Sequence, residues 1–374
     1  MNQPAPVWGW IPGRAAWAVA VVVLLLGGAA PAAGQPAPDS SGADSTASSV
    51  LVLPNMFYTP ETKIAGGLVL GYYTKLDPQS PTSGLQGAAI YTQRRQFYVQ
   101  ILPEFYWQQG RWRLDSELWA SRYPNVFYGI GPGVPAAQEE EYTARIADVQ
   151  AQLQRAVQPG WRIGPEVRVR TEEVTDVADG QLLDTQSIPG RTGATTLGLG
   201  LRSTWDGRDN LYYPRQGRFV EVAGMMHAAA AEDWHAFGRL TADARTYVPV
   251  AGTHVLAAQG YVEAVAGTAP FPLLPLLGGE DLMRGYREGR YRDRLFAALQ
   301  AAYRFPLVWR FKAAAFANIG QVAPRLDVFS LGDPKYALGA GLRLRLNDEG
   351  VHGRVDYAVS PAGGALYITL LEAF

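Results

Sequence analysis

The densest group of chemically active side chains is a run of arginines near position 290. Residues 282–293 read LMRGYREGRYRD, and residues 284–294 hold five arginines. Guanidinium groups bind carboxylates through paired hydrogen bonds, so the run indicates either pairing with fixed acceptors of the protein or a solvated loop. The whole chain has a formal net charge of −1. Such a balance gives no support to nucleic acid as a partner.

Residues suited to nucleophilic, acid–base or metal chemistry are sparse. The chain has no cysteine, which excludes disulfides, thiolate nucleophiles and cysteine-ligated zinc. His227, His235, His254 and His352 show no metal-binding spacing, and no Ser–His–Asp arrangement can be read around them. Turn or interface positions are the simpler interpretation, and a barrel hydrolase is the alternative. We therefore predict no catalytic residue, no metal site, no cofactor and no enzymatic activity.

A second polar cluster lies in STWDGRDNLYYPRQGRFVEV, residues 203–222. Its acids and Asn210 would be possible calcium ligands, but an arginine stands in their midst and favours a salt-bridged turn. Proline and glycine further along are typical of turns. We expect a turn motif between two strands, formed by Asp206, Arg208, Asp209, Pro214 and Gly217.

The elements that must position these groups are strands. In FYVQILPEFYW (97–107) and YALGAGLRLRLN (336–347), apolar residues alternate with polar residues or glycine. Period-two alternation fits any half-buried antiparallel sheet, including a soluble sandwich. Here it continues from Ser49 to Phe374, interrupted by Gly, Pro, Asn and Asp clusters. That persistence favours a transmembrane barrel, with apolar side chains toward lipid and polar ones toward the lumen.

The alternating runs can be counted. An even number is required if both ends of an antiparallel barrel lie on one side. The sixth run, YTARIADVQAQLQRAV, would suit a helix equally well. We predict an all-β protein, a transmembrane antiparallel β-barrel of 16 strands, at 50–58, 63–76, 85–94, 96–108, 111–120, 142–157, 161–175, 193–205, 217–230, 233–250, 253–267, 294–306, 310–323, 335–347, 350–361 and 364–374.

The first residues have the pattern of an export signal. One arginine, Arg14, precedes an apolar run from Ala15 to Ala30. Small residues of the kind found at signal-peptide cleavage sites follow this run. An uncleaved membrane anchor is the alternative. Residues 35–49 are rich in Ser, Ala, Pro and Asp and offer nothing to bury. We expect a signal peptide over 1–33, a disordered linker over 34–49, and an integral outer-membrane barrel over 50–374, with the lipid bilayer as its partner.

The last predicted strand, GALYITLLEAF, has a regular apolar face. Leu366, Ile368, Leu370 and Phe374 fall on that face, and only Glu372 interrupts it. A terminal aromatic facing lipid resembles the sorting signal of bacterial outer-membrane barrels. An ordinary edge strand is the alternative. We expect these four side chains to form a C-terminal sorting strand that faces lipid.

Several stretches together resemble one family. They are LPNMFYTPETKIAGGLVLGYY (53–73), the turn motif, Arg284-Gly285-Tyr286, YPNVFYGIGPG (123–133), YRFPL (303–307) and the final phenylalanine. Taken in their order along the chain, they resemble the BamA/TamA-type outer-membrane protein family, the bacterial surface antigen barrel. The resemblance implies that the loop bearing Arg284, Gly285 and Tyr286 folds into the lumen, where carboxylates of the inner wall hold the arginine. A solvated external loop is the alternative.

The chain departs from the family where the arginine should be held. Members tend to carry Phe-x-Asp-x-Gly after the loop, whereas FANIG supplies Phe316, Asn318 and Gly320, and Ala302 replaces a glutamate. An amide accepts a weaker hydrogen bond than a carboxylate. We expect Arg284 to contact Asn318 beside Gly320 and to take its charge partner from elsewhere. The candidate acids are Glu263 and Glu166.

The resemblance also implies a function. Assembly factors of this family carry periplasmic POTRA-like domains before the barrel, and the sequence shows none. We expect a barrel that assists insertion or translocation of client polypeptides, with a separate periplasmic partner for client capture. Pro54 and Asn55 in the first strand are poor ladder residues, which predicts a weak closing seam. The alternative is a passive pore or structural barrel, with Arg168, Arg170, Arg343 and Arg345 lining an anion-leaning lumen.

Overall fold

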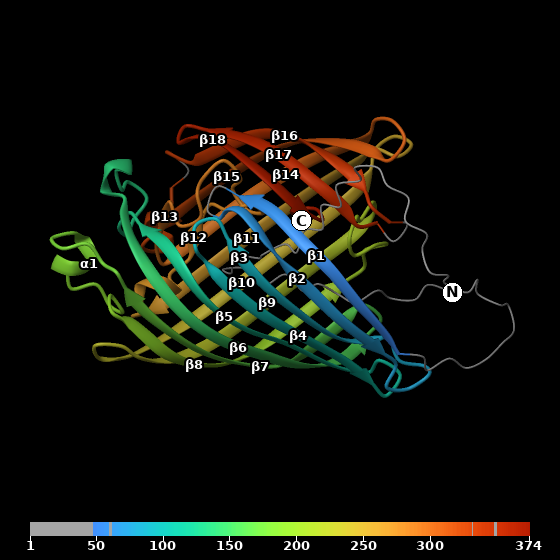
Figure 1. The fold of residues 1–374 in the computed structure, drawn as a ribbon, viewed down its shortest axis with the longest axis horizontal. Coiled ribbons are helices and arrows are strands. Elements are labelled where there is room, and N and C mark those ends of the chain that lie inside the picture. Colours follow the sequence, from blue (N-terminus) through green and yellow to red (C-terminus); the bar gives the residue numbers. More distant parts are fainter. Residues whose placement is uncertain (1–47, 60–61, 331, 348–349) are drawn as a thin grey trace, which may run out of the picture.

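The computed structural model describes residues 48–374, apart from 60–61, 331 and 348–349. Within them, sixteen antiparallel strands close into one barrel (Figure 1), which confirms the predicted fold. The strands are β1 (Ser49–Thr59), β2 (Lys63–Thr74), β3 (Ser83–Thr92), β4 (Phe97–Trp107), β5 (Trp112–Phe127), β6 (Glu140–Gln158), β7 (Trp161–Thr175), β8 (Gly193–Asp206), β9 (Gly217–Ala230), β10 (Trp234–Pro249), β11 (Val255–Gly267), β14 (Leu295–Pro306), β15 (Phe311–Ala323), β16 (Lys335–Arg345), β17 (His352–Ser360) and β18 (Gly363–Leu370).

Barrel strands that are consecutive in the chain are also neighbours in the wall, and β18 closes the barrel by lying next to β1. The ambiguous sixth run is a strand, because its polar residues Asp148, Gln150 and Gln152 alternate with Val149 and so line one face. β5 extends past the predicted residue 120, since residues 123–127 pair with β6. The last strand is shorter than predicted and ends at Leu370.

The two faces of the wall differ as the alternation predicts. On β8, Leu197, Leu199 and Leu201 are exposed on the outer surface, whereas Thr196 and Arg202 are buried toward the lumen. This places a polar network inside and a band of apolar side chains outside. Among the described residues, no helix is both long enough and apolar enough to cross a bilayer.

The two ends of the barrel differ in their connections. We call the end where β1 begins and β18 finishes the terminus side, and the other end the loop side. Tryptophans gather near strand ends on the terminus side, as is typical of a membrane interface: Trp107, Trp112, Trp161, Trp205 and Trp309.

The four longest connections lie on the loop side. They are 128–139 with a short 3₁₀ turn (Ala136–Gln138), 176–192 with α1 (Leu182–Thr185), 324–334 with a 3₁₀ turn (Leu326–Val328), and 268–294. The last contains a 3₁₀ turn (Phe271–Leu273) and a two-stranded sheet of β12 (Leu276–Leu277) and β13 (Tyr291–Arg292). The predicted signal peptide and nearly all of the predicted linker lie outside the described residues.

Candidate functional site

Connection 268–294 carries Arg284 into the barrel, where the side chain is 1% exposed. The backbone turns there through two residues of positive φ, Met283 (58°) and Gly285 (104°). A Cβ on Gly285 would stand 3.1 Å from Ala337 Cβ and 3.4 Å from Ser360 Cβ. Only glycine allows the loop to approach the wall of β16 and β17 so closely.

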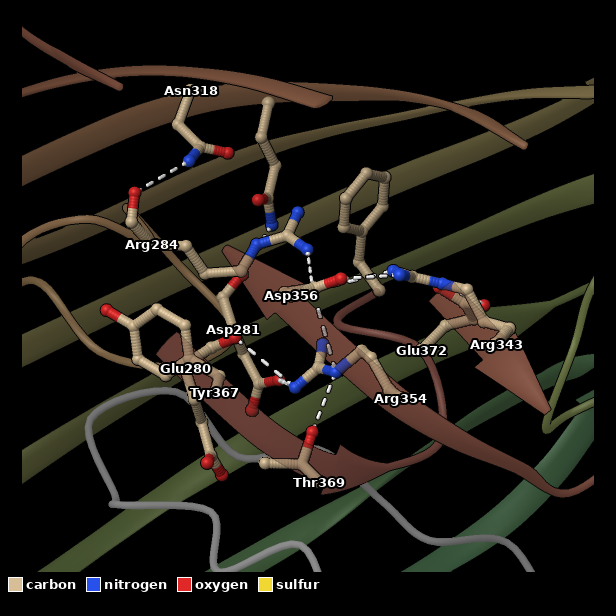
Figure 2. A network of polar contacts seen from close by, with 12 residues as sticks. Glu280, Asp281, Arg284, Asn318, Arg343, Arg354, Asp356, Tyr367, Thr369 and Glu372 are labelled. Atoms are coloured by element: carbon tan, nitrogen blue, oxygen red, sulfur yellow. Dashed lines mark hydrogen bonds and ion pairs between the residues drawn. The ribbon is translucent and has the colours of Figure 1, made fainter. Parts of the chain in front are cut away.

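Asp356 of β17 is the charge partner of Arg284. Arg284 Nη1 lies 2.6 Å from Asp356 Oδ2, and neither side chain is more than 1% exposed. The same carboxylate pairs with Arg343 and lies 3.8 Å from Arg354 Nε (Figure 2). The Arg284 guanidinium also stacks over Phe316, 3.5 Å from the ring centroid. Three arginines therefore converge on one buried carboxylate. Burying these charges costs free energy unless each is paired with an opposite charge.

The rest of the Arg-Gly-Tyr turn is held by hydrogen bonds to β16, β17 and β18. Gly285 N donates to Tyr367 Oη at 3.1 Å, and Ser360 Oγ donates to Gly285 O at 2.8 Å. Tyr286 Oη donates to the carbonyl oxygen of Tyr336 at 3.2 Å. We call this set of contacts around Arg284 and Asp356 the lumen brace.

A second ion pair joins the loop to the wall. Arg354 Nη2 lies 3.0 Å from Asp281 Oδ1, and Arg354 Nε donates to Thr369 Oγ1 at 2.7 Å (Figure 2). Burial raises the pKa of Asp281, although Arg354 opposes the rise. Burial lowers the pKa of Arg284 to about 10, so its guanidinium is charged at neutral pH.

The structure corrects the predicted wall partners. Glu263 pairs with Arg239 and accepts from Tyr261, and Glu166 lies 2.8 Å from Arg202 Nη2, so neither holds Arg284. These acids face the lumen, but from other parts of the wall.

Asn318 and Gly320 do lie beside the loop, in other roles. Asn318 Nδ2 donates to the backbone carbonyl of Arg284 at 3.2 Å. A Cβ on Gly320 would approach Met283 Sδ to 2.9 Å. Sequence reasoning missed Asp356, although the alternation in HGRVDYAVS places Arg354 and Asp356 together on the inner face.

Three of the four remaining arginines of the run tie the loop to connection 128–139 and the end of β5. The Arg292 guanidinium lies 5.2 Å from the ring centroids of both Phe127 and Phe271, and Gly131 N donates to Arg292 O at 2.8 Å. Arg290 donates to Val134 O at 2.9 Å, and Arg287 pairs with Glu139 at 3.0 Å. The arginine run therefore serves mainly as internal cross-links that fix connection 268–294 over the loop side of the lumen.

The inner wall carries further arginines, and acids accompany them. Arg168 lies 2.6 Å from Asp148, and Arg170 lies 2.5 Å from Glu172. Arg343, predicted to favour anions, pairs with Asp356 and Glu372. Paired charges leave little net field to select anions. Within the described residues, no group of three or more His, Asp or Glu is arranged to hold a metal ion.

The predicted turn motif closes the β8–β9 connection on the terminus side. Arg208 forms two hydrogen bonds with the carboxylate of Asp206, at 2.9 and 2.6 Å. Asp209 Oδ1 accepts from the backbone N–H groups of Arg215 and Gln216. Gly217 has φ 107°, and a Cβ there would collide with Gly207 O. The acids therefore hold the turn itself.

The predicted sorting strand is only partly on the lipid face. Leu366 is exposed and Ile368 is half-buried. Leu370 packs among Phe57, Ala65, Ile90 and Tyr98, which face the lumen, so the end of β18 passes on the inner side of β1. The prediction was therefore wrong for Leu370, and it was also wrong for Phe374.

The chain turns inward after β18. Leu371 has φ 61°, and Phe374 is buried inside the barrel with Tyr247 and Val255. The period-two pattern therefore ends with the strand at Leu370, and Phe374 no longer belongs to its outer face.

The closing seam is the weakest interface of the barrel. Among the described residues, β1 and β18 align at a single pair, Tyr58 with Ile368. Each of the other fifteen strand interfaces aligns at least eight pairs. Pro54 lies within β1 and has no N–H to contribute to a ladder.

Fold and site together define an outer-membrane β-barrel whose lumen holds an arginine-bearing loop. Residues 90–362 match the family model described as the Omp85 superfamily domain, and the chain belongs to this superfamily. The protein is an integral outer-membrane barrel of the BamA/TamA type. No curated protein shows significant sequence similarity to the chain.

Solved structures show the same fold at low identity. BamA from Haemophilus ducreyi lacking POTRA domains 1–3 aligns with TM-score 0.61 and 11% identity, over 87% of this chain and 70% of that one. CdiB from Escherichia coli aligns with TM-score 0.53 and 11% identity, over 88% and 63%. CdiB from Acinetobacter baumannii aligns with TM-score 0.52 and 10% identity, over 87% and 60%.

Proposed function

We propose that this barrel assists the insertion or translocation of other polypeptides at the outer membrane. The observation that carries the proposal is the seam, where one residue pair joins β1 and β18. A strand edge without a partner offers backbone N–H and C=O groups to an incoming strand, the mode of recognition called β-augmentation. The client is a polypeptide with strand-forming segments, delivered by a separate periplasmic partner.

The lengths of β17 and β18, which form the wall on one side of the seam, also support this proposal. β18 has 8 residues and β17 has 9, whereas β6 has 19. At about 3.3 Å per residue, β18 spans roughly 26 Å along its axis and β6 roughly 63 Å. The strands are therefore shortest on the β18 side of the seam. A shorter apolar band there would disturb the adjacent lipid through hydrophobic mismatch and lower the cost of insertion.

A passive pore is the less favoured function. The inner arginines Arg168, Arg170 and Arg202 are each paired with acids, and connection 268–294 lies over the loop side of the lumen. An open selective channel needs an unobstructed path and charges that face the permeating ion. The chemistry proposed is therefore strand pairing, without a catalytic centre.

A reversible lock on the seam tests the proposal. Cross-strand neighbours lie close enough for a disulfide, and the chain has no cysteine of its own. We expect vesicles that contain the protein to accelerate folding of a urea-denatured outer-membrane barrel. The pair Tyr58→Cys and Ile368→Cys, when oxidised, should abolish the acceleration, and reductant should restore it.

The matched control locks an ordinary interface. Tyr357 and Leu366 are aligned neighbours on β17 and β18, and both are exposed on the outer face. The oxidised pair Tyr357→Cys and Leu366→Cys should leave the acceleration unchanged. Full acceleration by the oxidised seam variant would contradict the proposal.

A further inference from the structure

The backbone of the β8–β9 connection, residues 207–216, is held in place by hydrogen bonds with its own side chains. Asn210 Oδ1 accepts from the backbone N–H groups of Tyr212 and Tyr213, both at 2.8 Å. Asp209 closes the far side of the turn through the N–H groups of Arg215 and Gln216. Both tyrosines are buried, although they lie in a connection at the mouth of the barrel.

Tyr213 reaches strands on the opposite wall. Its ring stacks on His352 of β17 with centroids 4.5 Å apart, and Lys312 Nζ of β15 stands 3.5 Å from the ring centroid. In the order of the barrel, β10, β11 and β14 to β16 separate β9 from β17. Connection 207–216 therefore spans the terminus-side mouth of the lumen instead of lying along its rim.

Arg304 of β14 ties this connection to the segment that follows β18. Its Nη1 donates to Pro214 O at 3.5 Å, and its Nη2 donates to the backbone oxygen of Phe374 at 2.5 Å. The guanidinium carbon lies 5.5 Å from the ring centroids of both Tyr213 and Phe374. Arg304 is 1% exposed, so its charge depends on these contacts.

Residues 371–374 are also anchored to the wall. Glu372 Oε1 lies 3.1 Å from Arg343 Nε, and Glu372 Oε2 lies 3.6 Å from Arg304 Nε. Arg343 in turn pairs with Asp356, the partner of Arg284. A continuous series of ion pairs therefore joins the end of β18 to the lumen brace.

We infer that connection 207–216 and residues 371–374 form one plug over the terminus-side mouth of the lumen, with Arg304 as the latch that holds both parts. The plug is distinct from the lumen brace, which enters from the loop side. Because one side chain binds both parts, this mouth opens when the end of β18 releases Arg304. The inference concerns access to the lumen and does not depend on the client activity proposed above.

A cysteine placed between the plug and the brace reports on this mouth. Ala314 faces the lumen on β15, between Lys312, which touches Tyr213, and Phe316, which touches Arg284. In detergent, the Ala314→Cys protein should react slowly with a bulky charged maleimide. Adding Tyr213→Ala or Arg304→Gln should raise the labelling rate several-fold, while Tyr213→Phe, which keeps the ring, should not.

Two controls separate plug release from general damage. Tyr72→Ala removes an exposed tyrosine of β2, and Arg310→Ala removes an arginine that lies over Trp309 at the β14–β15 turn. Neither should change the rate. Heat-modifiable migration on gels establishes that each variant is folded, and Arg304→Gln carries the test if Tyr213→Ala does not fold. Slow labelling in the folded plug variants, equal to that of the controls, would overturn the inference.

Discussion

Arg284 Nη1 lies 2.6 Å from Asp356 Oδ2, although position 318, where the family resemblance leads one to expect an aspartate, is occupied by asparagine. The carboxylate that meets Arg284 lies on β17, two strands away from position 318 on β15. Asn318 keeps a contact with the loop by donating to the carbonyl oxygen of Arg284. The guanidinium of Arg284 is therefore held by a carboxylate of β17, while position 318 holds the loop backbone instead.

Removing the carboxylate of Asp356 should destabilise the barrel strongly. Asp356→Asn leaves the buried arginines Arg284 and Arg343 without their shared counter-charge, a loss of about 3–5 kcal/mol. Urea unfolding followed by tryptophan fluorescence measures it. The control is Glu173→Gln, whose pair with Arg145 is more than half exposed on both sides and should change stability by less than about 1 kcal/mol.

Returning the charge to the family position should recover part of that loss. The double variant Asp356→Asn with Asn318→Asp places a carboxylate beside the loop again, near Arg284. We expect its urea midpoint to lie between those of Asp356→Asn and the parent protein. A double variant no more stable than Asp356→Asn would show that position 318 cannot serve Arg284.

Gly285→Ala should loosen the loop. The residue has φ 104°, and the added Cβ would press on Ala337 at 3.1 Å, so we expect a loss of about 1–3 kcal/mol. Gly353→Ala is the comparison, since its nearest neighbour would be 4.0 Å away. Equal unfolding midpoints for the two variants would mean that the loop does not pack closely against β16 and β17 at Gly285.

The anchoring of residues 371–374 should depend on pH in one direction. Burial works to raise the pKa of Glu372, but Arg343 and Arg304 outweigh it and hold that pKa below the ordinary value of 4.5. The stabilisation is therefore fully present above pH 4.5 and is lost as the pH falls toward the depressed value. The difference in melting temperature between parent and Glu372→Gln should be constant at neutral pH and shrink in acid. A difference that grew in acid would contradict the ion pairs.

Ion flow through the protein should be small and weakly selective. The inner arginines are neutralised by acids, and loops cross both mouths of the lumen. In planar bilayers we expect low, irregular conductance with similar permeability to potassium and chloride. A large, steady conductance that favours chloride would contradict this prediction and support the passive-pore function instead.

Much of the fold follows from the sequence because the membrane imposes a simple rule. Each strand alternates between lipid and lumen, so residues such as Leu197 and Arg202 report their faces directly. The rule fails where the chain leaves the wall. In the sequence, Phe374 continues the alternation of the last strand. The left-handed backbone conformation of Leu371 nevertheless turns the chain inward, so that Phe374 is buried.

The partner of Arg284 could not be chosen from the sequence because every inward acid satisfied the same pattern. Glu166, Glu263 and Asp356 all face the lumen. Which of them meets the loop depends on where connection 268–294 descends, and its path is set by distant contacts such as that between Arg292 and Phe127. Alternation fixes the face of a residue but not its position around the barrel.

The most direct test of the account is whether a client strand meets the edge of β1. A photo-reactive residue at Val52 on β1, 58% exposed, is compared with one at Leu199 on the distant β8, 60% exposed, during client folding in vesicles. The account predicts cross-links to the client from position 52 and not from position 199. Client insertion with no cross-links from position 52, or with equal cross-links from both positions, would contradict it.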